Sequence, residues 1–450
     1  MTEQPMTTTT TMMEIKVEVI ARETIKPSSP TLHHLKTFKL SLMDQFVPAS
    51  YTPLVLYYAT HGGSSYEERS QLLKNSLSQI LTRYYPLAGR IKDPLFVDCN
   101  DDGVDYIETR VNCPISSILE QPKSELQNHF IPIQFKESGS GSLLLIQASF
   151  FECGGMAIGI YTNHKLVADH YTLASFTTFL KAWAATASGF PDVVSPDFTA
   201  PSIFPARDDF QTLPPQVYEK PPQKVAVRRY VFNASKLQAL KAEAANARVQ
   251  QPTRVEAVMA LLWKCAMDAS RSRLGLGSTN PRRPSILVIS VDMRERLVPP
   301  LPESSFGNIG RPLVVHADDE SENEMNLSNL VSSIRESKLE LSKNCGVSEI
   351  CGLLMELGKL QMRGGEVDMY THTSWSRMPL YEADFGWGKP TWATIGHIEV
   401  PNVVVLSPSR DGEGIEAWVT LIEEDMAFFE CNKDLLDFAT INPSALNSFN

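Results

Sequence analysis

A proline-rich segment in the middle of the chain most constrains how this sequence can fold. Residues 191–223 hold eight prolines and show little periodicity, whereas the sequence on both sides alternates between strand and helix patterns. The 450 residues are also too many for one ordinary hydrophobic core. The sequence therefore predicts an α/β protein with domains over 1–190 and 224–450, joined by a crossover linker over 191–223.

Local patterns place strands and helices in both halves. Ser65 and Glu68 have the spacing of a capping box, which predicts a helix within 64–85. Turn residues between apolar runs predict β-hairpins over 95–111, 142–164 and 402–422. The half after the linker also holds a long amphipathic pattern beginning near Pro252 and a buried-strand run at 285–293, and these predict a helix and a strand.

Composition excludes several classes of function. The formal charge of −11 argues against a surface for nucleic acid or anionic membranes. No apolar run is long enough to span a bilayer, and the first residues lack a signal-peptide pattern, so we expect a cytoplasmic protein. The seven cysteines are dispersed without a CxxC pair, which indicates thiols in a reducing compartment.

The segment "TNHKLVADHYTLASFTTFLKAW", residues 162–183, is the strongest candidate for a reactive site. His164 ends a predicted buried strand, five residues before Asp169 and six before His170. A histidine there can act as a general base because its pKa lies near neutral pH, with the carboxylate or its partner fixing the local backbone. A hydrogen-bonded core histidine at a sheet edge gives the same local pattern, so both interpretations stay open.

Metal and thiol chemistry are both disfavoured at this motif. His164, Asp169 and His170 have suitable atoms for zinc, but the five-residue gap does not stack His164 and Asp169 on one helical face. No other Cys/His cluster completes a site, so we expect no metal. Cys153 could be a thiol nucleophile, but it lies in a Gly-Gly turn where a small residue serves packing.

Longer strings of the sequence resemble one family. A strand through "SFFECGGMAIGIYTNHK", then Asp169, a helix ending in "FLKAW", and an intact "DFGWG" at 384–388 are similar to the plant BAHD acyl-CoA-dependent acyltransferases, whose signatures are HxxxD and DFGWG. "TIKPSSPTL", "YYPLAGRI", "DMRERLVPPLP", "SFGNIG", "TSWSRMPLYEADFGWGKP" and "GEGIEAW" agree in order from about Val17 onward. The pattern is nearest to the branch that acetylates alkaloid hydroxyls.

The resemblance implies a fold and a reaction. It implies two similar chloramphenicol-acetyltransferase-like domains, with mixed sheets, flanking helices and an active-site channel at their interface. Acetyl-CoA would be the cosubstrate and an alcohol the small-molecule acceptor, with no permanently bound cofactor, no nucleic-acid or membrane partner, and a monomeric enzyme. His164 would take the proton of the acceptor hydroxyl while the oxygen attacks the thioester carbon directly.

The resemblance also assigns roles to other residues. Thr373 would lie near the oxyanion and Trp375 would line the pocket. Asp169 would pair with Arg294 and orient the loop that carries His164. The remaining assignments are a structural turn at Asp384, Gly386, Trp387 and Gly388, acceptor contacts from Asn163 and His170, and contacts to CoA from Thr253, Arg254 and Arg282. Arg282 belongs to a basic segment whose pattern by itself favours a solvated loop over a phosphate contact.

One departure from the family pattern raises a second hypothesis. Asp169 lies five positions after His164, whereas the family's aspartate lies four positions after its histidine. Because both flanks still match, we expect a bulge or irregular turn between Lys165 and Val167 to accommodate the extra residue. The alternative is a protein of this fold that binds or cyclises a hydrophobic small molecule without acyl-CoA.

Overall fold

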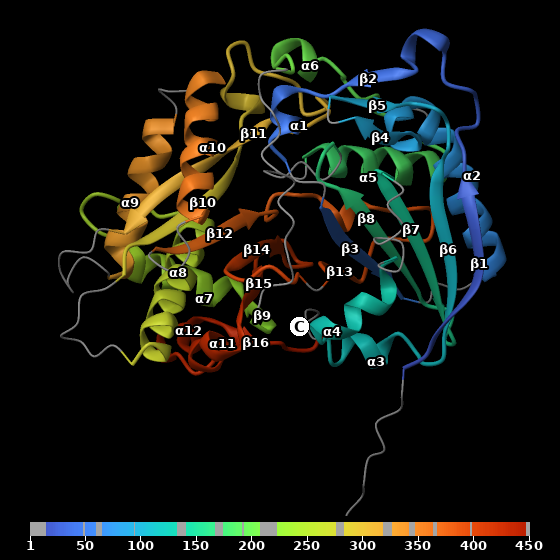
Figure 1. Ribbon diagram of the computed structural model, residues 1–450. Helices are drawn as coiled ribbons and strands as arrows, with labels where there is room; N and C mark the ends of the chain where they lie inside the picture. The colour runs from blue at the N-terminus through green and yellow to red at the C-terminus, as the bar shows by residue number, and fades with distance from the viewer. Residues whose placement is uncertain are drawn as a thin grey trace, which may run out of the picture.

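Two mixed β-sheets, each with its own helices, lie side by side in the computed structural model (Figure 1). The predicted mixed α/β class with two domains is confirmed. The structure describes residues 15–47, 50–59, 65–93, 95–132, 141–166, 174–190, 193–207, 223–275, 283–317, 326–341, 347–362, 367–396 and 398–446.

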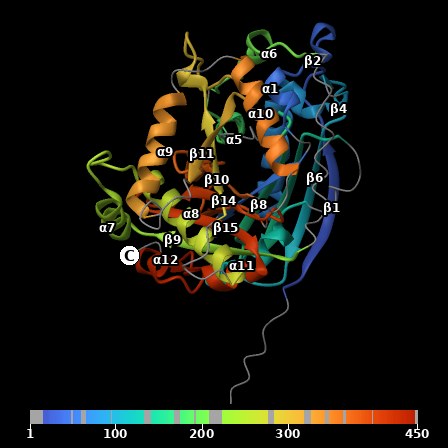
Figure 2. The same cartoon turned by 60° about the vertical axis from the view of Figure 1, so that its left-hand side comes forward.

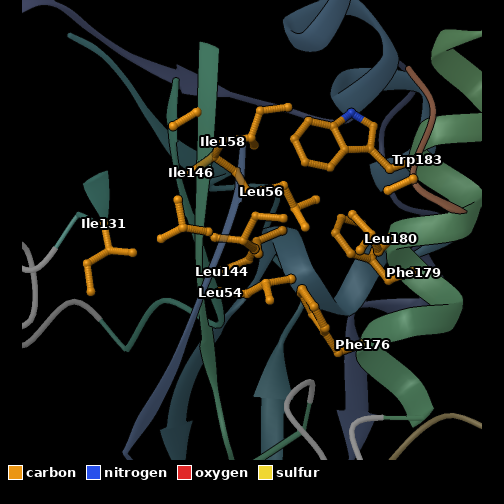
Figure 3. Packing of buried hydrophobic residues seen from close by; sticks show 14 of the residues in the cluster. Leu54, Leu56, Ile131, Leu144, Ile146, Ile158, Phe176, Phe179, Leu180 and Trp183 are labelled. Atoms are coloured by element: carbon orange, nitrogen blue, oxygen red, sulfur yellow. The ribbon is translucent and has the colours of Figure 1, made fainter. Parts of the chain in front are cut away.

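The first sheet, on the right in Figure 1, has six strands. In spatial order they are β1 (Val17–Ile25), β6 (Val104–Val111), β7 (Leu144–Phe151), β8 (Met156–Asn163), β3 (Tyr51–Tyr58) and β13 (Trp392–Thr394). Helices α2 (Tyr66–Arg83) and α5 (Ala174–Ala187) pack together. Figure 3 shows the apolar face of α5, from Phe176 to Trp183, directed at side chains of β3, β7 and β8. This face explains why the amphipathic run after His164 forms a helix.

The second sheet has seven strands and its own set of helices. Its strands are β11 (Gly310–Ala317), β10 (Ser285–Asp292), β12 (Asp368–Ser374), β14 (Val403–Pro408), β15 (Ile415–Ile422), β9 (Val225–Phe232) and β16 (Thr440–Ile441). The helices are α7 (Ala234–Ala244), α8 (Arg254–Arg273), α9 (Leu327–Leu341), α10 (Val347–Met362), α11 (Glu423–Phe429) and α12 (Lys433–Phe438). Helices α9 and α10 pack on β11 (Figure 2).

Short elements complete the fold. Strands β2 (Thr37–Lys39), β5 (Phe96–Asp98) and β4 (Arg90–Asp93) form a third sheet. The short helices are α1 (Leu42–Gln45), α3 (Ser116–Leu119), α4 (Ser124–Gln127) and α6 (Ala200–Ile203).

The two halves exchange segments. Strand β13 comes from the second half but pairs with β3 of the first sheet, Trp392 opposite Tyr57. In the other direction, Leu42 and Met43 of α1 pack in the core of the second sheet. The halves are therefore interlocked rather than merely tethered, and the division at 190 and 224 stays a prediction. Of the predicted linker, residues 191–192 and 208–222 lie outside the described residues.

Most local predictions are confirmed and one is wrong. The capping box forms, with Ser65 Oγ accepting from Glu68 N at 3.2 Å and Glu68 Oε2 accepting from Ser65 N at 2.9 Å. The hairpins β7–β8 and β14–β15 also form. However, β5 pairs with β2 and β4, whereas β6 pairs with β1 and β7, so 95–111 is not a hairpin.

The turn at 100–103 explains the error. The carboxylate of Asp101 accepts hydrogen bonds from Thr31 at 2.5 Å and from the Lys36 ammonium at 2.6 Å. The turn is therefore anchored to the segment before β2, and β5 leaves toward a different sheet from β6. Sequence pattern alone does not show which partner a strand takes.

The expectations about membrane-spanning segments and cysteines concern the whole chain, and the structure bears on its described part. No helix within it is long and apolar enough to cross a membrane. None of its cysteines is joined by a disulfide.

Candidate active site

Strand β8 carries the chain to His164. All eight residues of β8 are buried, and the strand pairs with β3 on one side and β7 on the other. His164 follows at once, is half-buried, and begins a turn over 164–166. Its backbone N–H donates to the Ser50 carbonyl at 2.8 Å. The hydroxyl of Thr52 lies 2.5 Å from Nε2 of its ring and 3.5 Å from Nδ1.

The two residues after His164 point inward. The Lys165 ammonium donates to the carbonyls of Asp44 and Gln45 at 3.4 and 3.2 Å, and burial lowers the Lys165 pKa against the opposing effect of the Asp44 charge. Leu166 is completely buried in the core of the first sheet. Lys165 and Leu166 belong to a turn over 164–166, where a bulge or irregular turn was expected, and both side chains are buried. Val167, Asp169 and His170 lie outside the described residues.

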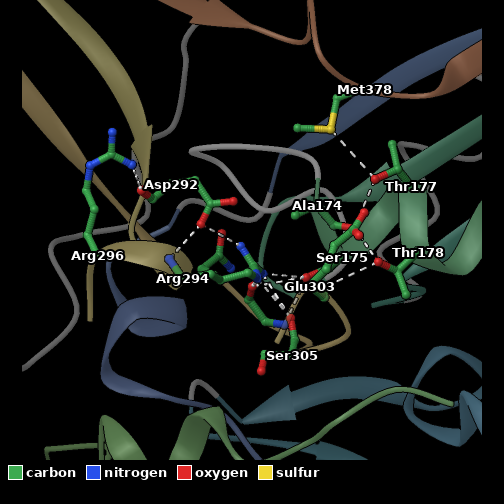
Figure 4. A network of polar contacts seen from close by, with 12 residues as sticks. Ala174, Ser175, Thr177, Thr178, Asp292, Arg294, Arg296, Glu303, Ser305 and Met378 are labelled. Carbon is green, nitrogen blue, oxygen red and sulfur yellow. Dashed lines mark hydrogen bonds and ion pairs between the residues drawn. The ribbon is translucent and has the colours of Figure 1, made fainter. Parts of the chain in front are cut away.

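Arg294 is the centre of a buried polar network (Figure 4). Its Nη2 donates to the carbonyls of Ser305 and Gly307, both at 3.0 Å, and to Ser175 Oγ at 3.2 Å. Its Nη1 lies 3.2 Å from the Asp292 carboxylate. Arg294 thus joins the start of α5 to the segment 305–307. The predicted pairing with Asp169 stays a prediction.

Thr373 and Trp375 lie at the end of β12. Thr373 is half-buried and stands opposite Val405 of β14. Trp375 donates its backbone N–H to the Leu406 carbonyl at 2.6 Å, and its indole is buried in the core of the first sheet. The indole therefore connects the two halves, and the oxyanion role of Thr373 and the pocket role of Trp375 stay predictions.

The DFGWG segment forms a tight turn. Asp384 Oδ1 accepts from the N–H groups of Gly386 and Gly388 at 2.8 and 2.9 Å. These glycines have φ values of +104° and +98°, a region that favours glycine. The Trp387 ring stacks on Phe385, with centroids 5.7 Å apart. These contacts support the proposed structural role of the four motif residues.

Three other predicted ligand residues, all within the described part of the chain, have protein partners. Asn163 Oδ1 accepts from Lys165 N at 2.9 Å. Thr253 caps α8, and its hydroxyl exchanges hydrogen bonds with Glu256. Arg254 donates to the carbonyls of Gly412 and Glu413 at 3.1 and 2.7 Å. Arg282 lies outside the described residues, and all four ligand roles stay predictions.

Three residues near His164 had no predicted role, namely Thr52, Asp44 and Asn308. Each lies far from His164 in the chain, so no local pattern connects them. Asn308 lies in the string "SFGNIG", which marked the family resemblance but pointed to no contact with the His164 turn.

Comparisons with known proteins agree with this architecture. The profile of the Transferase family matches residues 15–436. The 17,18-epoxy-17-hydroxycur-19-ene N-malonyltransferase of Strychnos nux-vomica is 38% identical over 440 residues, which cover 96% of this chain and 92% of the relative. Stemmadenine O-acetyltransferase of Catharanthus roseus is 33% identical over 426 residues, covering 92% and 96%.

A solved structure extends the likeness to three dimensions. The crystal structure of vinorine synthase superposes with a TM-score of 0.83 at 32% sequence identity, covering 96% of this chain and 100% of that one. The matches define an acyl-CoA-dependent acyltransferase. The chain belongs to the Transferase family, in its BAHD group, as its motifs indicated.

Proposed function

We propose that this enzyme transfers an acetyl group from acetyl-CoA to a hydroxyl of a bulky specialised metabolite, with His164 as general base. The observation that carries the proposal is the placement of His164, a half-buried imidazole delivered by a fully buried strand and held at its backbone and ring by Ser50 and Thr52. An alkaloid acceptor is supported by the strings shared with the alkaloid-acetylating branch. A cytoplasmic location and a monomeric state stay predictions.

The chemistry follows from the imidazole. Its unprotonated ring nitrogen takes the proton of the acceptor hydroxyl as the oxygen attacks the thioester carbon. The tetrahedral intermediate collapses, the C–S bond breaks, and the imidazolium returns the proton to the leaving thiolate. We propose that Thr373 donates to the oxyanion, because a preorganised donor there stabilises the developing charge.

The other residues take supporting roles in this proposal. Asp169 and Arg294 orient the segment after His164, and the DFGWG turn fixes the junction of the two halves. Asn163, His170 and Trp375 contact the acceptor, whereas Thr253, Arg254 and Arg282 lie on the CoA side. The acyl group is the least constrained element, since one relative is named a malonyltransferase and another an acetyltransferase.

Thiol release separates these possibilities. Purified enzyme is incubated with acetyl-CoA or malonyl-CoA and a panel of alkaloid alcohols, and free CoA is measured. We expect release with acetyl-CoA, and His164→Ala should lower turnover by about 10²–10⁴-fold. His34→Ala is the matched control, because His34 is an exposed histidine in a short 3-10 helix (His33–Leu35).

Two results would contradict the proposal. Retention of more than about a tenth of wild-type turnover by His164→Ala would remove the base assignment, given the usual contribution of such a group. If no acceptor releases thiol and CoA produces no thermal shift, the protein instead binds or cyclises a hydrophobic small molecule without acyl-CoA.

A further inference from the structure

Asn308 connects three segments that are distant in the sequence. It is completely buried and precedes β11 in the second half of the chain. Its side-chain Nδ2 lies 2.8 Å from Asp44 Oδ1 and 3.0 Å from the carbonyl oxygens of both His164 and Lys165. Its backbone N–H also donates to Asp44 Oδ1 at 2.9 Å. One amide therefore bridges helix α1 to the turn that begins at His164.

Asp44 is fixed by its own helix. Its second carboxylate oxygen accepts from the backbone N–H and the hydroxyl of Ser41, both at 2.7 Å, in the capping box of α1. Burial raises the pKa of Asp44, and the hydrogen bonds from Ser41 and Asn308 oppose that effect. Because Asp44 is held from both sides, it sets the position of the Asn308 amide.

Lys165 makes a second connection to α1. Its ammonium donates to the carbonyls of Asp44 and Gln45 near the end of that helix. Its backbone N–H donates to Asn163 Oδ1 at 2.9 Å. Asn308 therefore holds the turn through the carbonyls of His164 and Lys165. Helix α1 holds it through the side chain of Lys165.

The Arg294 network holds the residue that precedes Asn308. Arg294 Nη2 binds the Gly307 carbonyl, and the Gly307 N–H donates to Ser175 Oγ at 3.0 Å. These bonds fix the residue immediately before Asn308. A displacement of Asn308 would therefore have to break the hydrogen bonds of its own side chain and also those of Gly307.

We propose that Asn308 and Lys165 are positioning residues for His164, which clamp its turn onto helix α1. The inference rests on the proposed function, because it assumes that the imidazole position limits turnover. Reaction rates depend steeply on that position, and a displacement of about 1 Å can reduce the rate by about 10²-fold. Neither residue is required to touch a substrate.

Lys165→Met is the most direct test. It keeps the length of the side chain but removes the donor to the buried carbonyls of Asp44 and Gln45, so the melting temperature should fall. We expect kcat to fall by about 10- to 100-fold, with the KM values for acetyl-CoA and acceptor changed by less than about threefold. A purely structural role would change the melting temperature and leave kcat per folded molecule intact.

Asn308→Ala is the second variant, and Asn246→Ala is its matched control. Asn246 is a comparable bridging amide, since its Nδ2 donates to the Ser328 carbonyl at 2.6 Å and to Ser332 Oγ at 3.0 Å. Both alanine variants should lower the melting temperature. Only Asn308→Ala should also lower kcat of the folded enzyme, and it should cause no further loss in a His164→Ala background.

The outcomes separate the two proposals. If His164→Ala abolishes turnover while Lys165→Met and Asn308→Ala keep kcat, the clamp is overturned and the base assignment stands. Losses that add in the double variant also overturn the clamp, because Asn308 would then act independently of His164. If His164→Ala keeps its turnover, the base assignment falls and the clamp falls with it.

Discussion

The ring of Phe385 lies edge-on against the indole of Trp183, with centroids 4.9 Å apart and planes at 80°. Trp183 belongs to α5, the helix that follows the His164 segment, whereas Phe385 is the second residue of DFGWG. Ser188 just beyond α5 donates to the Asp384 carbonyl at 2.6 Å, and the Tyr58 hydroxyl of β3 donates to the Ala383 carbonyl at 2.8 Å. The motif of the second half is therefore docked on the elements that position His164.

This docking predicts that Asp384 contributes stability rather than chemistry. Asp384→Ala leaves the N–H groups of Gly386 and Gly388 without their shared acceptor, which should cost about 1–3 kcal/mol. Asp384→Asn keeps the accepting oxygen and should cost less. Denaturant unfolding measures the loss, and kcat per folded molecule should change little. A large kcat loss with unchanged stability would contradict this role.

Gly386→Ala should destabilise the same turn through backbone strain alone. Gly386 has φ +104°, and a Cβ built on it would meet no atom within 4 Å, so crowding contributes nothing. We expect a loss of about 1–2 kcal/mol. Gly352→Ala is the control, since Gly352 is an exposed helical glycine in α10 with an equally open Cβ position, and alanine there should stabilise by about 0.5–1 kcal/mol. Equal effects at both sites would argue against strain.

Arg294→Lys should destabilise the protein although it keeps the charge. The guanidinium donates hydrogen bonds to the carbonyls of Ser305 and Gly307 at the same time. A lysine ammonium cannot reproduce this planar arrangement of donors. Each buried carbonyl left without a donor costs about 1–3 kcal/mol. Melting temperature and expression should fall at least as much as kcat. Arg248→Lys is the control, because Arg248 is exposed and its ion pair with Glu336 is a surface contact. A wild-type melting curve for Arg294→Lys would contradict the network.

Local features of this fold could be predicted from the sequence because neighbouring residues determine them. The capping box at Ser65 and the hairpin turning at Gly154 are of this kind. Strand β13 could not be predicted, because three residues are too few for a periodic pattern and its partner β3 is more than 300 residues away. The partners of β5 and β6 were missed for a related reason, since a turn pattern does not show which sheet a strand joins.

The residues of the candidate site also fall into those that local sequence predicts and those that only the folded chain brings together. His164 could be located because a strand, a histidine and a helix follow one another in the chain. Thr52 and Asn308 could not, since 112 and 144 residues separate them from His164 and only the folded chain brings them together. The matching flanks predict a bulge or irregular turn after Lys165, but they do not show what holds the Lys165 side chain. Its burial depends on carbonyls of α1, which no pattern around His164 reveals.

Protonation of His372 should limit stability in mild acid. His372 of β12 is completely buried, and neither ring nitrogen has a hydrogen-bond partner in the described part of the chain. Burial lowers its pKa from 6.5 to about 3. Between these values the unfolded chain binds a proton that the folded chain does not, so the stabilisation present above about pH 6.5 is lost as the pH falls toward 3.

The effect can be isolated with His372→Leu, which replaces the imidazole by an apolar side chain of similar size. At pH 7.5 the variant should be as stable as the wild type or more so, because no hydrogen bond of His372 within the described residues is lost. Between pH 7.5 and 5 the wild type should lose about 2 kcal/mol more unfolding free energy than the variant, as one proton taken up over about 1.5 pH units requires. Urea unfolding at both pH values measures the difference, and His34→Ala, at an exposed histidine, should retain the wild-type pH dependence. An identical pH dependence for His372→Leu and the wild type would show that His372 is accessible to protons in the folded enzyme.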